Sequence, residues 1–207
     1  MQISVNKPQA AFLALTNRYR AFVSGFGGGK TYIGCIAQCL DFWKYPGVNQ
    51  GYFAPTIPQI RDIYYPTIQE VAYSLGLSVE IREGNKEAHF FEGRKYRGTT
   101  ICRSMQLPES IVGFKIGSAL VDEVDLMPTD KADRAWNKII ARMRYQDASN
   151  RVSVTSTPEG YKFMYNRFVL NKTERYGMVQ ASTYDNEAVS YTHLRAHETP
   201  EHLVCRL

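Results

Sequence analysis

A glycine-rich stretch at residues 24–31, Ser-Gly-Phe-Gly-Gly-Gly-Lys-Thr, limits this chain to few folds. The short apolar run before it, residues 20–23, predicts a strand. Residues 31–43 follow it with apolar side chains at the spacing of one helical face, which predicts a helix. In a strand–glycine–helix unit, backbone N–H groups converge on an anion at the positive end of the helix dipole. The stretch therefore predicts a phosphate-binding loop, or P-loop.

The last two residues of this loop carry the side chains that a nucleotide needs. Lys30 is expected to contact the outer phosphates, and the Thr31 hydroxyl is expected to bind Mg²⁺. The strict pattern has glycine where this chain has Ser24. A flexible turn with an incidental lysine is the alternative, which the four glycines and the flanking elements disfavour. We expect ATP and Mg²⁺ as cofactors, with the nucleotide held by Ser24, Gly25, Phe26, Gly27, Gly28, Gly29, Lys30 and Thr31.

A second apolar run, residues 118–121, ends in Asp122 and Glu123. Ligands of open α/β sheets bind at the carboxyl ends of the strands, so this run places two acids where a nucleotide would lie. Asp122 is expected to hold Mg²⁺ through water, and Glu123 is expected to deprotonate the attacking water as a general base. The alternative is that both acids lie in a solvated loop without a function. The P-loop upstream in the same chain disfavours this alternative. Because binding alone needs no base, Glu123 favours Mg²⁺-dependent ATP hydrolysis.

The rest of the chain alternates between predicted strands and helices, with one exception. Residues 77–103 contain short alternating stretches that predict two or three antiparallel strands. We therefore expect an α/β P-loop NTPase of the RecA-like type, with a mainly parallel central sheet flanked by helices and an antiparallel excursion. The other predicted strands are 51–54, 118–121, 151–155 and 177–181, and the other predicted helices are 58–75, with a kink or break at Pro66, 131–143 and 161–170.

Composition excludes some classes of protein and suggests one kind of partner. Hydrophobic residues make up 44% of the chain and charged residues 22%, as in ordinary globular domains. No apolar run is long enough to predict a transmembrane helix, so no membrane partner is expected. The net charge of +5 suits a polyanion without identifying one. The basic residues that we consider for nucleic acid are Arg94, Lys95, Arg97, Lys131, Arg134 and Lys138.

A third segment, VSVTSTP at residues 152–158, ends in hydroxyl side chains, which a Ser/Thr turn would also explain. The order SGFGGGKT, ALVDE, TSTPEG and ASTYDN, taken together, resembles the ATPase domain of the large terminase subunit of tailed phages, over roughly residues 8–186. The stretch PESIVGFKIGSALVDEVDLMP also resembles that family around its acidic strand.

This resemblance implies a motor that couples ATP hydrolysis to translocation of double-stranded viral DNA into a procapsid. It implies a homo-oligomeric ring on the portal protein, a small terminase subunit as partner, and a location in the host cell cytoplasm, transiently on the procapsid portal. By position, Gln9 resembles the glutamine that reads adenine, and Ser156 and Thr157 resemble the coupling motif. There are two alternatives. One is another nucleic-acid-dependent P-loop ATPase, of the helicase type, and the other is a nucleotide-binding scaffold without turnover.

One departure concerns the arginine that many relatives carry inside the P-loop, about where Phe26 stands. Arg142 and Arg144 are our candidates for an arginine finger, with a surface or DNA-facing role as the alternative.

The family continues into a nuclease domain, for which too few residues follow Asp185, so no DNA cleavage is expected of this chain. We assign residues 1–189 to the ATPase domain. Residues 190–207 are expected to be a non-native tail that resembles translated sequencing adapter; a native helix and a histidine metal tract are the alternatives.

Overall fold

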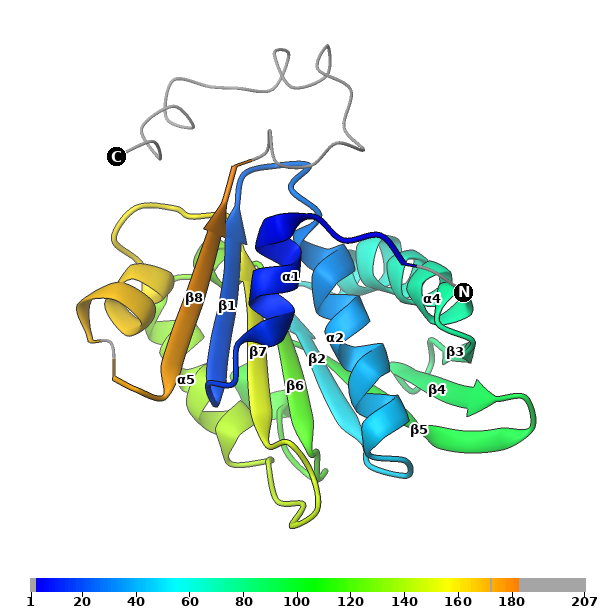
Figure 1. Cartoon of the computed structure of the whole chain (residues 1–207). Helices are drawn as coiled ribbons and strands as arrows, with labels where there is room; N and C mark the ends of the chain where they lie inside the picture. The colour runs from blue at the N-terminus through cyan, green and yellow to red at the C-terminus, as the bar shows by residue number, and fades with distance from the viewer. Residues whose placement is uncertain (1–2, 172, 183–207) are drawn as a thin grey trace.

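The computed structural model describes residues 3–171 and 173–182, which form a sheet with helices on both faces (Figure 1). Within this part of the chain the sheet has eight strands, in the order β3-β4-β5-β2-β6-β7-β1-β8. The strands are β1 (Tyr19–Ser24), β2 (Gln50–Ala54), β3 (Ser78–Arg82), β4 (Glu87–Glu92), β5 (Lys95–Ser104), β6 (Ser118–Asp122), β7 (Arg151–Ser156) and β8 (Tyr176–Ala181).

Strands β5, β2, β6, β7, β1 and β8 run parallel, whereas β4 pairs antiparallel with both β3 and β5. This confirms the mainly parallel sheet and the antiparallel excursion that the sequence predicts. Parallel strands end at one edge of a sheet, so β1, β6 and β7 deliver the P-loop, Asp122 and Ser156 to the same edge.

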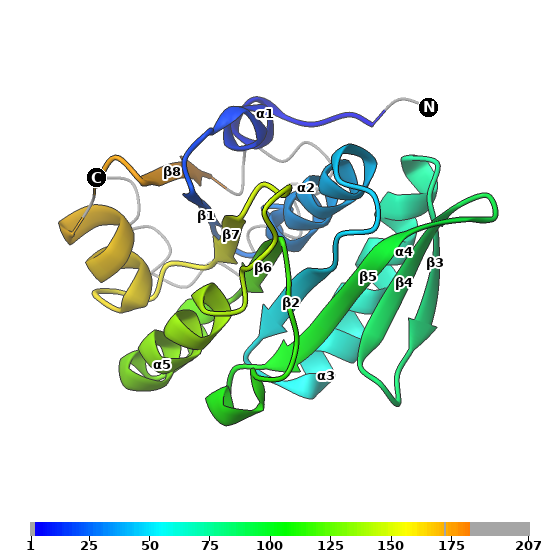
Figure 2. The same cartoon turned by 90° about the horizontal axis from the view of Figure 1, so that it is seen from below.

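Two helical layers cover the sheet (Figure 2). On one face lie α1 (Lys7–Ala14), α2 (Lys30–Lys44) and α4 (Tyr65–Ser74); on the other lie α5 (Thr129–Ile140) and the π-helical segment η4 (Tyr165–Leu170). Leu120 of β6 packs in the cluster under α2, while its neighbours Ala119 and Val121 pack in the cluster under α5. A Cβ on Gly34 of α2 would lie 2.7 Å from Leu120 Cδ1, so this glycine lets α2 approach β6 closely.

The helices differ from the sequence prediction at three places. Where the sequence predicts a helix over residues 58–75, residues 57–74 form one continuous helical run of three parts, α3 (Ile57–Gln59), the π-helical turn η1 (Ile60–Tyr64) and α4. The Tyr65 N–H bonds to the Ile60 carbonyl, so the wide turn directly precedes Pro66. Helix α5 ends at Ile140 instead of reaching residue 143, because Met143 forms a bridge with Ile116.

The third difference is α1, which the sequence analysis did not anticipate. The sequence does contain residues that mark the start of this helix, because Asn6 and Gln9 form a capping box. The Gln9 N–H donates to Asn6 Oδ1, and Gln9 Oε1 accepts from the Asn6 N–H. Short 3₁₀ turns also occur at η2 (Pro108–Ser110) and η3 (Val124–Leu126). Among the described residues, none of the helices combines the length and hydropathy that crossing a bilayer requires.

Candidate functional site: a P-loop facing two acidic residues

The loop between β1 and α2 adopts the backbone that its glycines predict. Gly27 and Gly29 have φ angles of 73° and 72°, in the left-handed region that glycine tolerates without strain. Gly29 is the N-cap of α2, and Lys30 is its first residue. A cavity of about 300 Å³ opens over the loop, lined by residues 27–32, by Thr67 and Glu70 of α4, and by Glu123. This is a concave site at a helix N-terminus, where phosphate groups bind.

Ser24, which departs from the strict P-loop pattern, is accommodated by a neighbouring glycine. Its hydroxyl donates to the Gly25 carbonyl over 3.2 Å. A Cβ on Gly28 would overlap Ser24 Oγ and would also lie 2.8 Å from Ser24 Cβ. The side chain at position 24 therefore requires that position 28 have none.

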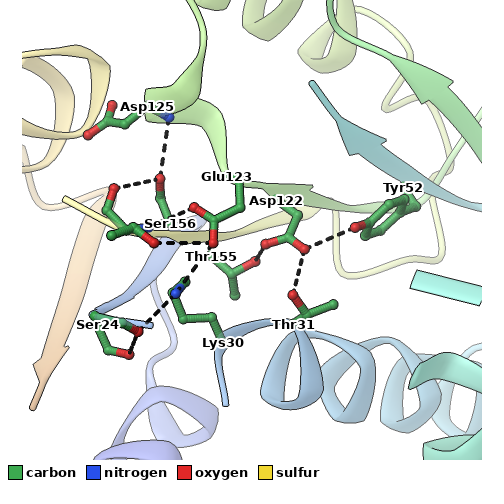
Figure 3. A network of polar contacts seen from close by, with 11 residues as sticks. Ser24, Lys30, Thr31, Tyr52, Asp122, Glu123, Asp125, Thr155 and Ser156 are labelled. Atoms are coloured by element: carbon green, nitrogen blue, oxygen red, sulfur yellow. Dashed lines mark hydrogen bonds and ion pairs between the residues drawn. The ribbon is translucent and has the colours of Figure 1, made fainter. Parts of the chain in front are cut away.

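Asp122 lies at the end of β6 and is almost completely buried. Its carboxylate accepts three hydroxyl hydrogen bonds, shown in Figure 3: from Thr31 over 2.7 Å, from Tyr52 over 2.9 Å and from Thr155 over 2.7 Å. Burial raises the pKa of Asp122, and the nearby Glu123 raises it further, while the three hydroxyls favour the charged form and oppose both effects.

Magnesium fits this donor set. Thr31 Oγ1 and Asp122 Oδ2 are only 2.7 Å apart, and both are hard oxygen ligands. Mg²⁺ commonly takes one or two protein oxygens of this kind, with phosphate oxygens and waters completing its shell. The two residues predicted to bind Mg²⁺ are therefore brought together.

Glu123 occupies an uncommon backbone conformation at the turn after β6. Its φ of 49° and ψ of 45° place it in the left-handed region, which non-glycine residues rarely adopt and which is often found at functional sites. Its carboxylate accepts from the Thr157 N–H over 2.9 Å and from the Thr157 hydroxyl over 3.3 Å. Lys30 Nζ lies 3.3 Å from Glu123 Oε1 and donates to the Gly25 carbonyl over 3.0 Å. The predicted base thus faces the predicted phosphate-binding lysine (Figure 3).

Ser156, the last residue of β7, and Thr157, which follows it, contact the same turn. Ser156 Oγ accepts from the Asp125 N–H over 3.3 Å, and Thr157 contacts Glu123 as described above. Asp125 is fully buried, and its Oδ1 accepts from the Met164 N–H over 2.9 Å. Both residues of the predicted coupling motif are therefore hydrogen-bonded to the turn that carries Glu123.

Three further residues of this network escaped the sequence analysis: Tyr52, Thr155 and Asp125. Thr155 lies inside the recognised segment 152–158, and Asp125 follows Glu123 by two residues, so their positions were a usable signal. Tyr52 lies on a strand without a recognised motif, and only the pairing of β2 with β6 brings it to Asp122.

Gln9 does not reach the cavity over the P-loop in this structure. It is a buried residue of α1, and its carboxamide oxygen caps that helix through the Asn6 N–H. Its role in reading adenine stays a prediction.

Arg142 and Arg144 lie far along the fold from the P-loop. They flank Met143, which forms a bridge with Ile116. Ile116 lies two residues before the start of β6. The P-loop follows the end of β1, so these arginines are at the opposite edge of the parallel strands. The Arg144 side chain donates from Nε to the Ala141 carbonyl over 2.8 Å. An arginine-finger role would require a neighbouring subunit, and it stays a prediction.

One of the basic residues considered for nucleic acid is held inside the fold. Arg97 is buried, its guanidinium lies 4.8 Å from the centroid of the Trp43 ring, and it donates to the Trp43 carbonyl over 2.8 Å. It therefore belongs to the packing between β5 and α2, and it is neither the DNA contact nor the solvated surface residue that the sequence analysis considered. Arg94 and Lys95 of the same stretch are exposed.

Comparison with known proteins agrees with this architecture. The family model described as "Terminase large subunit, T4likevirus-type, N-terminal" matches residues 21–198. This range runs past Val189 into residues 190–207, which lie outside the described residues, so the assignment of a non-native tail stays a prediction. No curated protein sequence matches the chain significantly.

Solved structures of phage packaging proteins share the fold at low sequence identity. The large terminase of a thermophilic bacteriophage, in complex with ADP, has a TM-score of 0.80 at 16% identity, over 95% of this chain and 51% of that chain. The ATPase domain of the Thermus phage P74-26 large terminase gives 0.69 at 15%, over 96% and 90%. The bacteriophage phi29 genome packaging motor assembly gives 0.55 at 14%, over 77% and 49%. The chain thus spans about half the length of the first of these proteins.

Proposed function

The chain belongs to the family of T4-like large terminase subunits, whose N-terminal part it matches, and we propose that it hydrolyses ATP with Mg²⁺ to move double-stranded viral DNA into a procapsid. The family and its structural neighbours support a role in viral DNA packaging. The observation that carries the hydrolytic proposal is the convergence of four side chains. Lys30 Nζ lies 3.3 Å from Glu123 Oε1, and the Thr31 hydroxyl donates to Asp122. Lys30, Thr31 and Glu123 also line the cavity over the P-loop.

Each of these side chains has a chemical task in the proposed reaction. The backbone N–H groups of the P-loop and Lys30 would hold the phosphates. Thr31 and Asp122 would hold Mg²⁺, which neutralises charge on the outer phosphates. A bound triphosphate gives Lys30 an anionic partner other than Glu123. Glu123 would then be available to orient a water and accept its proton.

The binding of a nucleotide is supported by the large terminase of the thermophilic bacteriophage, which has been solved with ADP and with ATP-gamma-S. For this chain, we propose that ATP is the nucleotide and that Gln9 contributes to its recognition. The proposed partners are double-stranded DNA, the portal protein, a small terminase subunit and further copies of this chain in a ring. The proposed location is the host cell cytoplasm, transiently on the procapsid portal. The phi29 packaging motor assembly is a precedent for such a machine.

The experiment that tests this proposal measures phosphate release from ATP by the purified chain, with and without Mg²⁺ and double-stranded DNA. We expect Mg²⁺-dependent turnover that DNA accelerates. Lys30→Ala removes the charge that faces the phosphates and should abolish turnover. The matched control is Lys44→Ala, which removes an exposed lysine from the opposite end of the same helix. Equal turnover in the two variants would contradict the assignment.

A strand-separation assay, run beside the measurement of phosphate release, separates the alternatives. A helicase-like ATPase would unwind a duplex that carries a single-stranded overhang, whereas a packaging motor is expected only to move along it. A nucleotide-binding scaffold would bind ATP without releasing phosphate, and Glu123 argues against it because binding needs no base.

A further inference from the structure

Tyr52 is the residue of this site that no motif identifies. It lies on β2, where it pairs in register with Leu120 of β6. Its side chain is 1% exposed, and its hydroxyl donates to Asp122 Oδ2 over 2.9 Å. The same carboxylate oxygen accepts the Thr31 hydroxyl, so Tyr52 and Thr31 meet on one atom of the predicted magnesium ligand.

The Tyr52 ring is fixed in place by its surroundings. It stacks on the Tyr64 ring, with centroids 3.7 Å apart and planes inclined by 13°. Tyr64 is itself anchored, because its hydroxyl donates to Gln38 Oε1 over 2.9 Å, and Gln38 Nε2 donates to the Gly51 carbonyl. A buried ring with so little freedom can direct its hydroxyl to only one acceptor, which is a means of orienting that acceptor.

Tyr52 also lines a second cavity, which lies beside the P-loop and Asp122. This cavity, of about 50 Å³, is lined by Tyr52, Thr31, Asp122 and Glu123 together with residues of β2 and the α3–η1 run. Tyr52 therefore borders the space where a metal ion and its waters would lie, while its hydroxyl is directed at the carboxylate.

We infer that Tyr52 is a positioning residue, which holds the Asp122 carboxylate in the orientation that binds Mg²⁺. This inference rests on the proposed function, since it assumes that Asp122 serves a magnesium–nucleotide complex. Without the hydroxyl, Asp122 Oδ2 loses one of its two hydrogen bonds in a site that water does not freely reach, and the carboxylate gains freedom to rotate.

The test compares Tyr52→Phe with Tyr64→Phe in the full chain. Each variant loses one buried hydroxyl from the same ring stack, but only the first hydroxyl touches Asp122. The measurement is the Mg²⁺ concentration for half-maximal ATP-gamma-S binding, with ADP affinity in EDTA and the melting temperature recorded alongside. For Tyr52→Phe we expect the Mg²⁺ requirement to rise at least about fivefold, with ADP affinity in EDTA unchanged. Tyr64→Phe should keep the wild-type Mg²⁺ requirement.

An unchanged Mg²⁺ requirement in Tyr52→Phe would overturn the inference. An equal rise in both variants would also overturn it, because the effect would then come from the packing of the stack. A wild-type chain that binds ATP-gamma-S with Mg²⁺ but does not hydrolyse ATP would contradict the proposed function and leave this comparison valid. Absence of any Mg²⁺-dependent binding would overturn both.

Discussion

Glu123 is the residue on which the proposed chemistry depends. It combines a left-handed backbone, an ion pair with Lys30 and two hydrogen bonds from Thr157. A strained residue persists only when its surroundings hold it, and here the Glu123 N–H is also bound by the Thr155 carbonyl over 2.7 Å. The arrangement holds the carboxylate at the cavity before any nucleotide binds.

The first prediction concerns this carboxylate. Glu123→Gln keeps the size of the side chain and an oxygen that can accept from Thr157, but the amide cannot take a proton from water. We expect nucleotide affinity close to wild type and turnover lower by roughly 10²–10⁴-fold. Equilibrium binding of ATP-gamma-S and steady-state phosphate release measure the two quantities. The control is Glu80→Gln, an exposed acid on the edge strand β3. Normal turnover in Glu123→Gln would place the base elsewhere.

The candidate residues that could be predicted from the sequence are those whose chemistry depends on their neighbours along the chain. Lys30 and Thr31 follow the glycines directly, and Asp122 and Glu123 end an apolar run, so each could be assigned before the fold was known. Tyr52 could not, since its hydroxyl matters only because β2 lies beside β6. The burial of Arg97 could not be predicted for a related reason. Its charge can be read from the sequence, whereas its contact with Trp43 depends on the fold.

At the scale of the element, the P-loop shows how one departure from a pattern constrains another position. Ser24 fills the space that a side chain at position 28 would need. Gly28 is not among the glycines with positive φ, so its backbone would tolerate an alanine. The main obstacle to substitution there is therefore the Ser24 side chain, and the Gly25 carbonyl, at 3.2 Å, is the one other close contact. Removing the Ser24 side chain should therefore relieve most of the effect of an alanine at position 28.

The second prediction tests this dependence with a double substitution. Gly28→Ala alone should force the loop to shift and weaken ATP-gamma-S binding at least about tenfold, because its new Cβ would overlap Ser24 Oγ. Adding Ser24→Gly removes the obstruction and should recover most of the affinity. Ser24→Gly alone is the control and should bind like wild type. If the double variant binds no better than Gly28→Ala, the overlap is not the cause.

The third prediction concerns the packing of the helix that carries the P-loop. Gly34 lets α2 lie close to Leu120, so Gly34→Val should push the helix from β6 and destabilise the fold by roughly 1–3 kcal/mol. Urea unfolding followed by circular dichroism measures this free energy. The matched control is Gly84→Val, at a turn position with open space around its Cβ and without a positive φ. A Gly34→Val variant as stable as wild type would show that α2 adjusts freely.

Element boundaries were predicted least well where local and tertiary signals compete. Helix α5 stops before residue 143 because Met143 pairs with Ile116, a contact that periodicity along the helix cannot reveal. The run 57–74 stays helical through Pro66 because the wide turn at η1 precedes it and removes the need for a break. Conversely, α1 was missed even though its capping box is written in the sequence.

At the scale of the whole molecule, the parallel sheet separates the proposed nucleotide site from the proposed DNA contacts. The proposed nucleotide site lies at the carboxyl edge, where β1 and β6 end. The β4–β5 turn, with Arg94 in the turn and Lys95 as the first residue of β5, lies at the amino end of this parallel strand. The alternation of strands and helices predicted this class of sheet, but strand order was set by pairings that no local pattern contains.

The last prediction is that double-stranded DNA binds through its phosphates, without sequence preference. A motor that moves along any genome cannot depend on base edges, and the net charge of +5 suits a polyanion. Among the basic residues considered, Arg94 and Lys95 are exposed, whereas Arg134 and Lys138 are paired with Asp130 and Glu109. Each phosphate contact releases counterions, so affinity should fall steeply with salt.

We therefore expect the double variant Arg94→Ala with Lys95→Ala to bind duplex DNA more weakly and to lower the slope of log affinity against log salt by about two. The matched control is Arg82→Ala with Lys86→Ala, which removes the same charge from exposed residues at the other end of β4. Fluorescence anisotropy at several salt concentrations, on two unrelated duplexes, measures both slope and sequence preference. An equal loss of slope in the control would mean that net charge, rather than the β4–β5 turn, determines binding, and a strong preference for one duplex would contradict the phosphate mechanism.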